Sequence, residues 1–308
     1  MLAIPTFYGN LSEDVGAAIA NADNVDGIVL DFRGDPGGDL ESMARTVGEF
    51  LDGGPIGYRH ARFLGHTTPV IDENSAANTA PLLVMIDEGS RSASELAAMA
   101  LQKRRRAIVF GSPSGGKGNI QWPSRVNRGA EGDQGVYLTT PELYYGPLGY
   151  SPQGHGVAPD VGVRRISEPE LYGERALGEP LAGGRLVAGP QIKAVYEDDS
   201  GALPEGEELE VPVPFAPPFD LEAARQGHAQ RLADDPELRT IAEALDSPSV
   251  PTPERLSLNL SERLRTGTRE GDEAISPWTM SPEAYQALAE QDRWLREAVS
   301  VLWDAHGS

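Results

Sequence analysis

The sequence predicts an α/β fold in which strands and helices alternate around a mainly parallel sheet. Short apolar runs recur between residues 1 and 163, glycine-rich turns follow several of them, and each turn leads into apolar residues at helical spacing. The chain has 308 residues, of which 39% are hydrophobic. This length is enough for one large domain or two ordinary ones.

The first part of this region contains two strand–helix units. Residues 2–4 form the end of a strand, and the segment after it has the apolar spacing of a helix. A buried strand is predicted at 27–33, and the turn at 34–38 leads into a second helix. The apolar faces of the two helices consist of Val15, Ile19 and Ala22, and of Leu40, Met43, Val47 and Leu51.

A third unit follows, with a strand at 82–87 and a helix after it. The apolar side of this helix consists of Leu96, Ala97, Ala100 and Leu101. Residues 107–110 and 136–140 add further strands. The glycine turns and the serine-rich turn at 90–94 lie at the carboxyl ends of strands, where open α/β sheets usually bind ligands.

The composition changes after residue 163. Residues 164–218 are rich in glycine, proline and acidic residues, which predicts a linker or an irregular excursion. Residues 219–308 contain two helical patterns, at 221–245 and 282–305. We therefore predict a core at 1–163, a linker at 164–218 and a smaller helical C-terminal domain at 219–308.

Charge and residue usage exclude several classes of function. A net charge of −21 argues against binding to nucleic acid or anionic membranes, because an acidic surface repels phosphates. Without cysteine there is no disulfide, thiolate metal site or cysteine nucleophile, and the five histidines show no metal-ligand spacing. We therefore expect no metal. No signal peptide or membrane-spanning run is visible.

Ser92 stands at the predicted start of the helix after strand 82–87. Backbone N–H groups are unpaired at a helix start, and the helix dipole is positive there, so a developing oxyanion would be stabilised. Serine is also a preferred N-cap residue, and for Ser92 taken alone capping is the favoured interpretation. As a nucleophile it needs a base to take its proton.

Lys117 is the nearest candidate base, because no histidine lies near either element. It stands 25 residues beyond Ser92 in a glycine-rich turn at 115–118. To act as a base, its pKa must fall from ~10.4 to about 7 to 8, which requires burial. For any single lysine, a solvated turn residue is the simpler interpretation.

Residues 111–117 also fit a phosphate-binding loop up to the lysine. Gly118 replaces the serine or threonine that would hold Mg²⁺, and residues 119–123 look extended where that loop requires a helix. We therefore expect no nucleotide.

The turn at 34–38 contains Pro36, Gly37 and Gly38. A plain turn into a helix explains these residues. Alternatively, a glycine here lets a backbone N–H approach a substrate carbonyl as one donor of an oxyanion hole. The second donor would be the N–H of Ala93, which follows the candidate nucleophile.

Four short motifs occur in a characteristic order, at residues 31–38, 87–95, 115–121 and 154–161. In these motifs and in the interval from Ser92 to Lys117, the chain resembles the C-terminal processing, or tail-specific, serine peptidases, which use a Ser-Lys dyad. The likeness covers residues 4–163 well. It extends more weakly to 229–237 and 256–260, where the longer bacterial members are similar.

This resemblance implies a Clp protease/crotonase-like α/β core and cleavage of proteins near accessible C-termini through an acyl-enzyme, without a cofactor. It also implies a periplasmic or cell-envelope location. The implied roles are Ser92 as nucleophile, Lys117 as general base, Gln121 as the residue that orients the lysine, Gly38 and Ala93 as oxyanion donors, and Glu95 and Gly37 as supporting residues.

The chain departs from the family pattern in three places. Members usually carry a PDZ domain that grips the substrate's C-terminus, and here nothing precedes the first core strand, so we expect any such segment to lie upstream of this chain. The alternative is a truncated, non-catalytic remnant that binds peptides or a partner.

The other two departures are single residues. Lys103 stands where an aspartate is common, either as a cation that lowers the pKa of Lys117 or as surface charge. Gly115 replaces a bulky residue, which predicts a looser turn.

Overall fold

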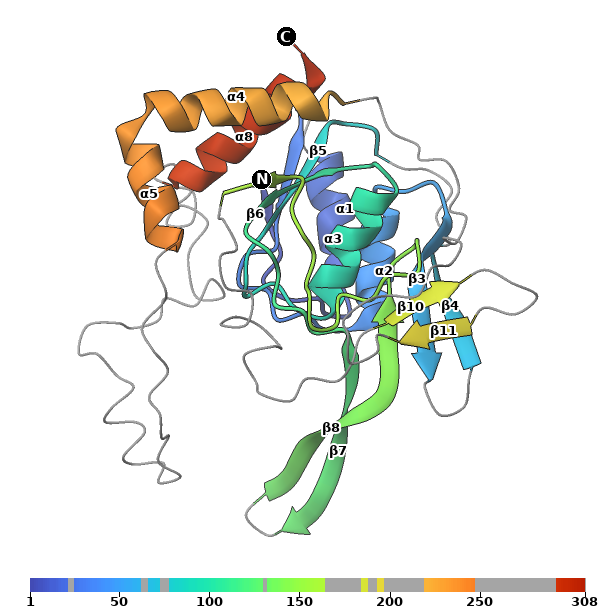
Figure 1. Cartoon of the computed structure of the whole chain (residues 1–308). Helices are drawn as coiled ribbons and strands as arrows, with labels where there is room; N and C mark the ends of the chain where they lie inside the picture. The colour runs from blue at the N-terminus through green and yellow to red at the C-terminus, as the bar shows by residue number, and fades with distance from the viewer. Residues whose placement is uncertain are drawn as a thin grey trace.

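A five-stranded parallel sheet forms the centre of the chain (Figure 1). Its strands, in spatial order, are β1 (Leu2–Ala3), β2 (Ile28–Asp31), β5 (Leu82–Ile86), β6 (Ile108–Gly111) and β9 (Val161–Gly162). The computed structural model describes residues 1–21, 25–61, 66–72, 78–129, 132–163, 184–187, 193–196, 219–246 and 292–307. The α/β fold class and the parallel central sheet that we predicted are confirmed.

The central strands are mostly apolar because both faces of the sheet are covered; β5 is apolar along its whole length, whereas β2 ends in Asp31. Side chains alternate between the two faces, so Leu82, Val84 and Ile86 of β5 join one hydrophobic cluster while Leu83 and Met85 join the other. Strands β2 and β6 alternate in the same way.

Three helices cover the first face: α1 (Leu11–Ala20), α2 (Leu40–Gly48) and α3 (Ala93–Lys103). Helix α2 begins at the N-cap residue Asp39, whose side chain accepts the N–H of Ser42 at 2.7 Å. Helix α3 is buried from Ala93 to Leu101, and its alanines let the neighbouring elements pack closely. Three helices are thus found in the predicted segments, but α2 ends at Gly48, before Leu51, and Ala22 lies outside the described residues.

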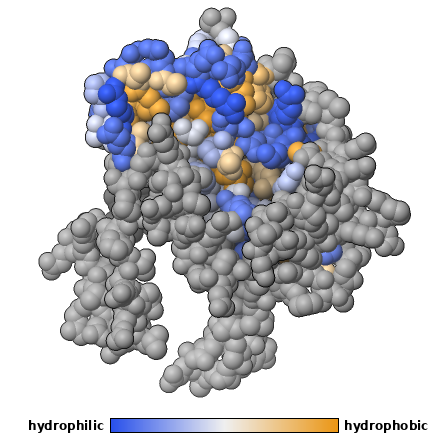
Figure 2. All heavy atoms as spheres, viewed as in Figure 1, coloured by the Kyte–Doolittle hydropathy of each residue, from blue (hydrophilic) through white to orange (hydrophobic). Residues whose placement is uncertain are grey.

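Two helices from the C-terminal part cover the other face: α4 (Leu221–Asp234) and α8 (Arg293–His306). The helical pattern predicted at 221–245 is two helices in the structure, because the chain is extended at Asp235, before Pro236, and helix α5 (Pro236–Asp246) begins there. Between α4 and α8, His228 Nδ1 lies 2.7 Å from Glu297 Oε1, and Arg231 forms ion pairs with Glu297 and Asp304. In Figure 2 the surface of α4 and α5 is mainly hydrophilic, and hydrophobic residues gather where these helices meet α8.

A second, antiparallel sheet stands beside the first, with the order β4-β3-β8-β7. Its strands are β3 (Gly54–Ala61), β4 (His66–Asp72), β7 (Asn119–Gly129) and β8 (Gly132–Tyr145), and the β7–β8 hairpin projects away from the body (Figure 1). The strand predicted at 136–140 belongs to this sheet and not to the parallel one. Leu96 of α3 packs against the backbone of Gly57, so the sheet lies on the helix that carries Ser92.

Parts of the predicted organisation lie outside the described residues. Within 164–218, the structure describes only an antiparallel pair, β10 (Gly184–Val187) and β11 (Lys193–Tyr196). The motif at 256–260 and the start of the helical pattern at 282–305 are also outside the described residues. The boundaries at 163 and 219 therefore stay predictions. Among the described residues, no helix has both the length and the apolar character needed to cross a membrane.

Candidate active site

Ser92 occupies a strained turn between β5 and α3. Its φ is 58°, a value that is uncommon for a residue with a side chain and that tends to occur at functional sites. The turn before it is fixed by Ser90, whose hydroxyl donates to the carbonyl of Phe32 at 2.8 Å and accepts the N–H of Asp87 at 3.0 Å. Ser92 therefore stands at the N-terminus of α3, as the sequence predicted.

One buried carboxylate joins the turn of Ser92 to the turn of Lys117. Glu95 Oε2 accepts the N–H of Ser92 at 2.8 Å and the N–H of Lys117 at 2.7 Å. Its Oε1 accepts the N–H of Gly116 at 2.7 Å and the hydroxyl of Ser114 at 2.5 Å. The Glu95 side chain is fully buried, so these four donors replace the water that a carboxylate would otherwise bind.

Burial raises the pKa of Glu95 to about 7, against the opposing effect of the four hydrogen bonds. These hydrogen bonds favour the ionised carboxylate, because a protonated carboxyl group accepts fewer donors. The ionised form of Glu95 is therefore the form that holds both turns.

The Gly37-Gly38 loop approaches Ser92 so closely that a side chain would not fit. A Cβ on Gly37 would lie 2.6 Å from the carbonyl oxygen of Arg91 and 2.8 Å from the nitrogen of Ala93, and the φ of Gly37 is 101°. On its other side, the loop forms a parallel bridge with Phe7, which uses the carbonyl of Gly37 and the N–H of Asp39. The N–H of Gly38 takes no part in that bridge.

Asp35, in the same loop, is a buried carboxyl group that the sequence reasoning missed. Its Oδ1 accepts the N–H of Gly37 at 2.7 Å, and its Oδ2 has no hydrogen-bond partner. Burial raises its pKa to about 8. Its backbone carbonyl accepts the N–H of Arg91 at 2.8 Å and the hydroxyl of Ser94 at 2.9 Å. Asp35 thus connects the glycine loop with the turn of Ser92.

The turn of Lys117 packs on the fourth motif. The N–H of Gly118 donates to the side chain of Gln153 at 2.8 Å, and the N–H of Val157 donates to the hydroxyl of Ser114 at 2.6 Å. Strand β7 begins directly after Gly118, so the helix that a phosphate-binding loop requires is not formed.

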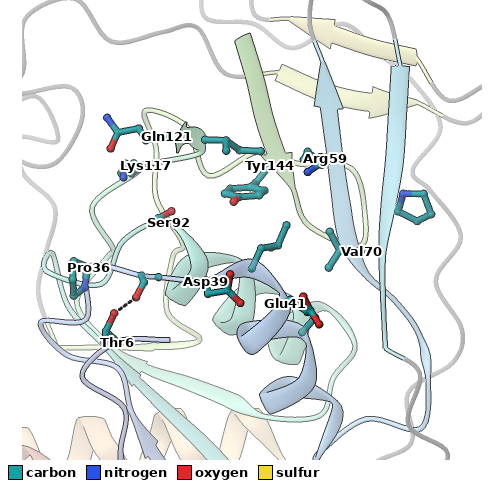
Figure 3. A pocket seen from close by; sticks show the side chains of 16 residues that line it. Thr6, Pro36, Asp39, Glu41, Arg59, Val70, Ser92, Lys117, Gln121 and Tyr144 are labelled. Carbon is teal, nitrogen blue, oxygen red and sulfur yellow. Dashed lines mark hydrogen bonds between the residues drawn. The ribbon is translucent and has the colours of Figure 1, made fainter. Parts of the chain in front are cut away.

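These loops meet at a pocket of about 1010 Å³. Of the residues that the sequence singled out, the pocket is lined by Gly37, Gly38, Ser92, Lys117 and Gln121. Figure 3 shows Ser92, Lys117 and Gln121 along one side of this pocket. Ala93 and Glu95 are buried behind the surface, and Lys117 is half-buried.

The opposite wall comes from the antiparallel sheet, and the sequence reasoning did not find it. Its lining residues are Arg59, Pro69, Val70 and Tyr144. Tyr144 is buried, and burial raises the pKa of its hydroxyl to about 12, with Glu142 and Asp39 adding to the effect and Arg59 opposing it. Its place at the pocket follows from the pairing of β8 with β3, which joins residues far apart in the sequence.

Lys103 lies away from this site. It is the last residue of α3, and a rise of about 1.5 Å per residue puts its backbone roughly 16 Å from that of Ser92. Its charge acts on Asp160 instead. The described residues also contain no group of His, Asp or Glu side chains that could hold a metal ion.

Residues 1–163, just over half of the chain, match peptidase family S41. The chain is 27% identical to the tail-specific protease of Haemophilus influenzae, over 99% of this chain and 44% of that protein. It is 35% identical to the carboxy-terminal-processing protease of Bartonella bacilliformis, over 65% of this chain and 46% of that protein.

Among solved structures, the photosystem II D1 C-terminal processing protease is 28% identical with a TM-score of 0.43, over 55% of this chain and 42% of that one. The chain spans less than half the length of the two relatives named above. Its sequence match over residues 1–163 shows that the chain belongs to peptidase family S41.

Proposed function

We propose that the chain is the catalytic part of a serine endopeptidase that cleaves proteins near their C-termini, with Ser92 as nucleophile and Lys117 as general base. The observation that carries this proposal is the position of Glu95, which accepts the N–H groups of Ser92 and Lys117 with the same oxygen. The bond from Ser92 alone is that of a capping box, in which a glutamate three residues on accepts the N–H of the N-cap serine. A capping box does not require the same oxygen to accept the N–H of Lys117 as well, and this second bond ties the two turns together. Both residues line one pocket together with Gly38.

In the proposed reaction, Ser92 Oγ attacks the carbonyl carbon of the scissile peptide bond while Lys117 takes the hydroxyl proton. The N–H groups of Gly38 and Ala93 donate to the oxyanion that develops on the carbonyl oxygen. Lys117 then gives the proton to the leaving amine, and water hydrolyses the acyl-enzyme. Gln121, on the same side of the pocket, orients the lysine amine. No step requires a cofactor.

The substrates that we propose are proteins or peptides with accessible C-termini. The names of the two relatives, a tail-specific and a carboxy-terminal-processing protease, support this substrate class. A periplasmic or cell-envelope location belongs to the same proposal, and fractionation of the source cells tests it.

Replacement of either proposed dyad residue tests the function. We expect Ser92→Ala and Lys117→Ala each to lower turnover of a peptide with a free C-terminus by about three orders of magnitude or more, because the two act as a unit. Ser300→Ala, at a half-buried serine on α8, and Lys103→Ala are the matched controls and should retain activity. Full proteolysis by the Ser92→Ala protein would refute the assignment.

A burst of product from a reactive ester separates the peptidase from the non-catalytic alternative. An active dyad accumulates acyl-enzyme and releases one equivalent of alcohol rapidly, whereas a peptide-binding remnant does not. We expect a burst in the wild-type chain and none in the Ser92→Ala protein. A wild-type chain that binds peptides without a burst would favour the remnant.

A further inference from the structure

Arg33 lies at the base of the glycine loop, between two carboxylates. Its Nε donates to Asp31 Oδ1 at 2.9 Å, and its Nη2 donates to Asp31 Oδ2 at 2.6 Å, which is the two-pronged geometry that fixes a guanidinium plane. The same Nη2 lies 2.6 Å from Asp292 Oδ2. Burial alone would lower the pKa of Arg33, but the two carboxylates outweigh it and raise that pKa above its ordinary value.

Asp292 belongs to the opposite end of the chain, and its two oxygens have different partners. It is the N-cap of α8, where Oδ1 accepts the N–H of Trp294 at 2.9 Å and the N–H of Leu295 at 3.1 Å. Its Oδ2 holds Arg33. The Asp292 side chain is 24% exposed and that of Arg33 is 26% exposed, so this pair is shielded more than an ordinary surface ion pair.

Arg33 and Gly38 are connected through the short backbone segment between them and its hydrogen bonds. The next residue, Gly34, donates its N–H to Asp87 Oδ1 at 2.8 Å, and the N–H of Asp35 donates to the carbonyl of Phe32 at 3.0 Å. Asp35 in turn accepts the N–H of Gly37. A displacement of Arg33 therefore acts on a loop whose backbone is packed against Ser92.

We propose that Arg33 and Asp292 are positioning residues that couple helix α8 to the loop at 34–38, so that docking of this C-terminal helix sets the position of the Gly38 N–H. The catalytic consequence rests on the function proposed above, in which Gly38 is an oxyanion donor. The coupling itself rests on the contacts of Arg33 and Asp292.

The variant Asp292→Asn separates the coupling from helix capping. Asparagine caps a helix about as well as aspartate, so α8 keeps its start while the ion pair with Arg33 is lost. Asp304→Asn is the matched control, because Asp304 lies on the same helix, is 28% exposed and pairs with Arg231 of α4. Both variants are made in the full chain.

Two readouts are expected to change in Asp292→Asn and not in Asp304→Asn. Backbone amides between residues 33 and 39 should exchange hydrogen faster, because the loop has lost one anchor. The kcat should fall roughly 3- to 30-fold with KM changed less than about twofold, because an oxyanion donor acts mainly in the transition state. Unchanged exchange in this loop, or an equal change in Asp304→Asn, would overturn the proposal.

A double-mutant cycle with Arg33→Gln tests whether the two residues act through each other. If they do, Asp292→Asn adds little to the effect of Arg33→Gln on loop exchange and kcat, whereas additive effects would contradict the coupling. The exchange measurement does not depend on catalysis. A wild-type chain without turnover would refute the peptidase proposal, and the exchange result would still decide whether α8 holds the loop.

Discussion

Asp35 and Glu95 are two buried carboxyl groups near the same pocket, and their surroundings differ. Glu95 accepts four hydrogen bonds, whereas Asp35 accepts one through Oδ1 and has no partner for Oδ2. An ordinary glutamate has a higher pKa than an ordinary aspartate. Here burial reverses this order, because it raises the pKa of Glu95 to about 7 and that of Asp35 to about 8. Hydrogen bonds to the charged form explain why Glu95 is shifted less.

Asp35 should make stability depend on pH. Because its pKa is higher in the folded chain than in the unfolded chain, its contribution to stability is complete below about pH 4 and is lost as the pH rises to about 8. In this range the free energy of unfolding should fall more steeply in the wild type than in Asp35→Asn, by up to about 1.4 kcal/mol per pH unit. Urea unfolding between pH 4 and pH 9 measures this difference.

The exposed residue Asp26 supplies the control for Asp35. A change in pH dependence that also appears in Asp26→Asn would be an effect of net charge and not of the burial of Asp35. Parallel stability curves for the wild type and Asp35→Asn would show that Asp35 does not titrate in this range.

At the scale of elements, the site consists of three loops that contact one another. The loop at 34–38 contacts the turn of Ser92, and Glu95 ties that turn to the turn of Lys117. Each loop follows a strand of the parallel sheet, so strand order brings together segments that are distant in the sequence. The close approach of Gly37 to the turn of Ser92 can be tested by adding a single methyl group.

Gly37→Ala should damage the site, whereas Gly34→Ala should mainly cost stability. Both glycines have positive φ values, 101° and 70°, so both substitutions strain the backbone. Only at Gly37 would the new methyl group meet the backbone at Arg91 and Ala93; nothing lies within 4 Å of a Cβ on Gly34. We expect kcat to fall more than tenfold for Gly37→Ala and about 1 kcal/mol of stability to be lost for Gly34→Ala.

Peptide turnover and urea unfolding of both alanine variants measure these effects. Equal kcat values for Gly37→Ala and Gly34→Ala would mean that contact with the turn of Ser92 does not matter for the reaction.

Local patterns in the sequence were sufficient to predict helices α1, α2 and α3 and the parallel strands β1, β2, β5 and β6, whereas the short edge strand β9 was not predicted. Two such patterns are the helical spacing of Leu40, Met43 and Val47 and the apolar run at 82–87. Each depends only on residues that are neighbours in the sequence, and the structure contains the corresponding helix α2 and strand β5. The antiparallel wall of the pocket was not predicted, because Tyr144 reaches the pocket through pairing of β8 with β3. The burial of Asp35 was missed for a similar reason, since it depends on segments that pack around the loop.

At the scale of the whole molecule, helices α4 and α8 pack directly against the parallel sheet and cover one of its faces. Leu83 and Met85 of the central strand share one hydrophobic cluster with Ala298 and Leu302 of α8. A continuous apolar run in a strand already requires cover on both faces, so this packing was implicit in the sequence. We therefore expect the sheet and these helices to unfold together.

Leu302→Ala tests this cooperative unit. Leu302 is 7% exposed, and its loss should cost about 2 to 5 kcal/mol of the free energy of unfolding in a single transition. Val299→Ala on the same helix is the control, because Val299 is 50% exposed and should change stability by less than about 0.5 kcal/mol. Two separate transitions, with only the weaker one affected, would instead favour an independent C-terminal domain.

The two walls of the pocket differ in origin, except that Gln121, on the side of Ser92, belongs to strand β7 of the antiparallel sheet. Ser92 and the Gly37-Gly38 loop belong to the parallel layer, whereas Arg59, Val70 and Tyr144 project from strands of the antiparallel sheet. Substitutions in β3, β4 or β8 can therefore reshape the space for a substrate side chain without disturbing the bonds around Glu95. Selectivity can diverge among related chains, or be redesigned, while the reaction chemistry stays the same.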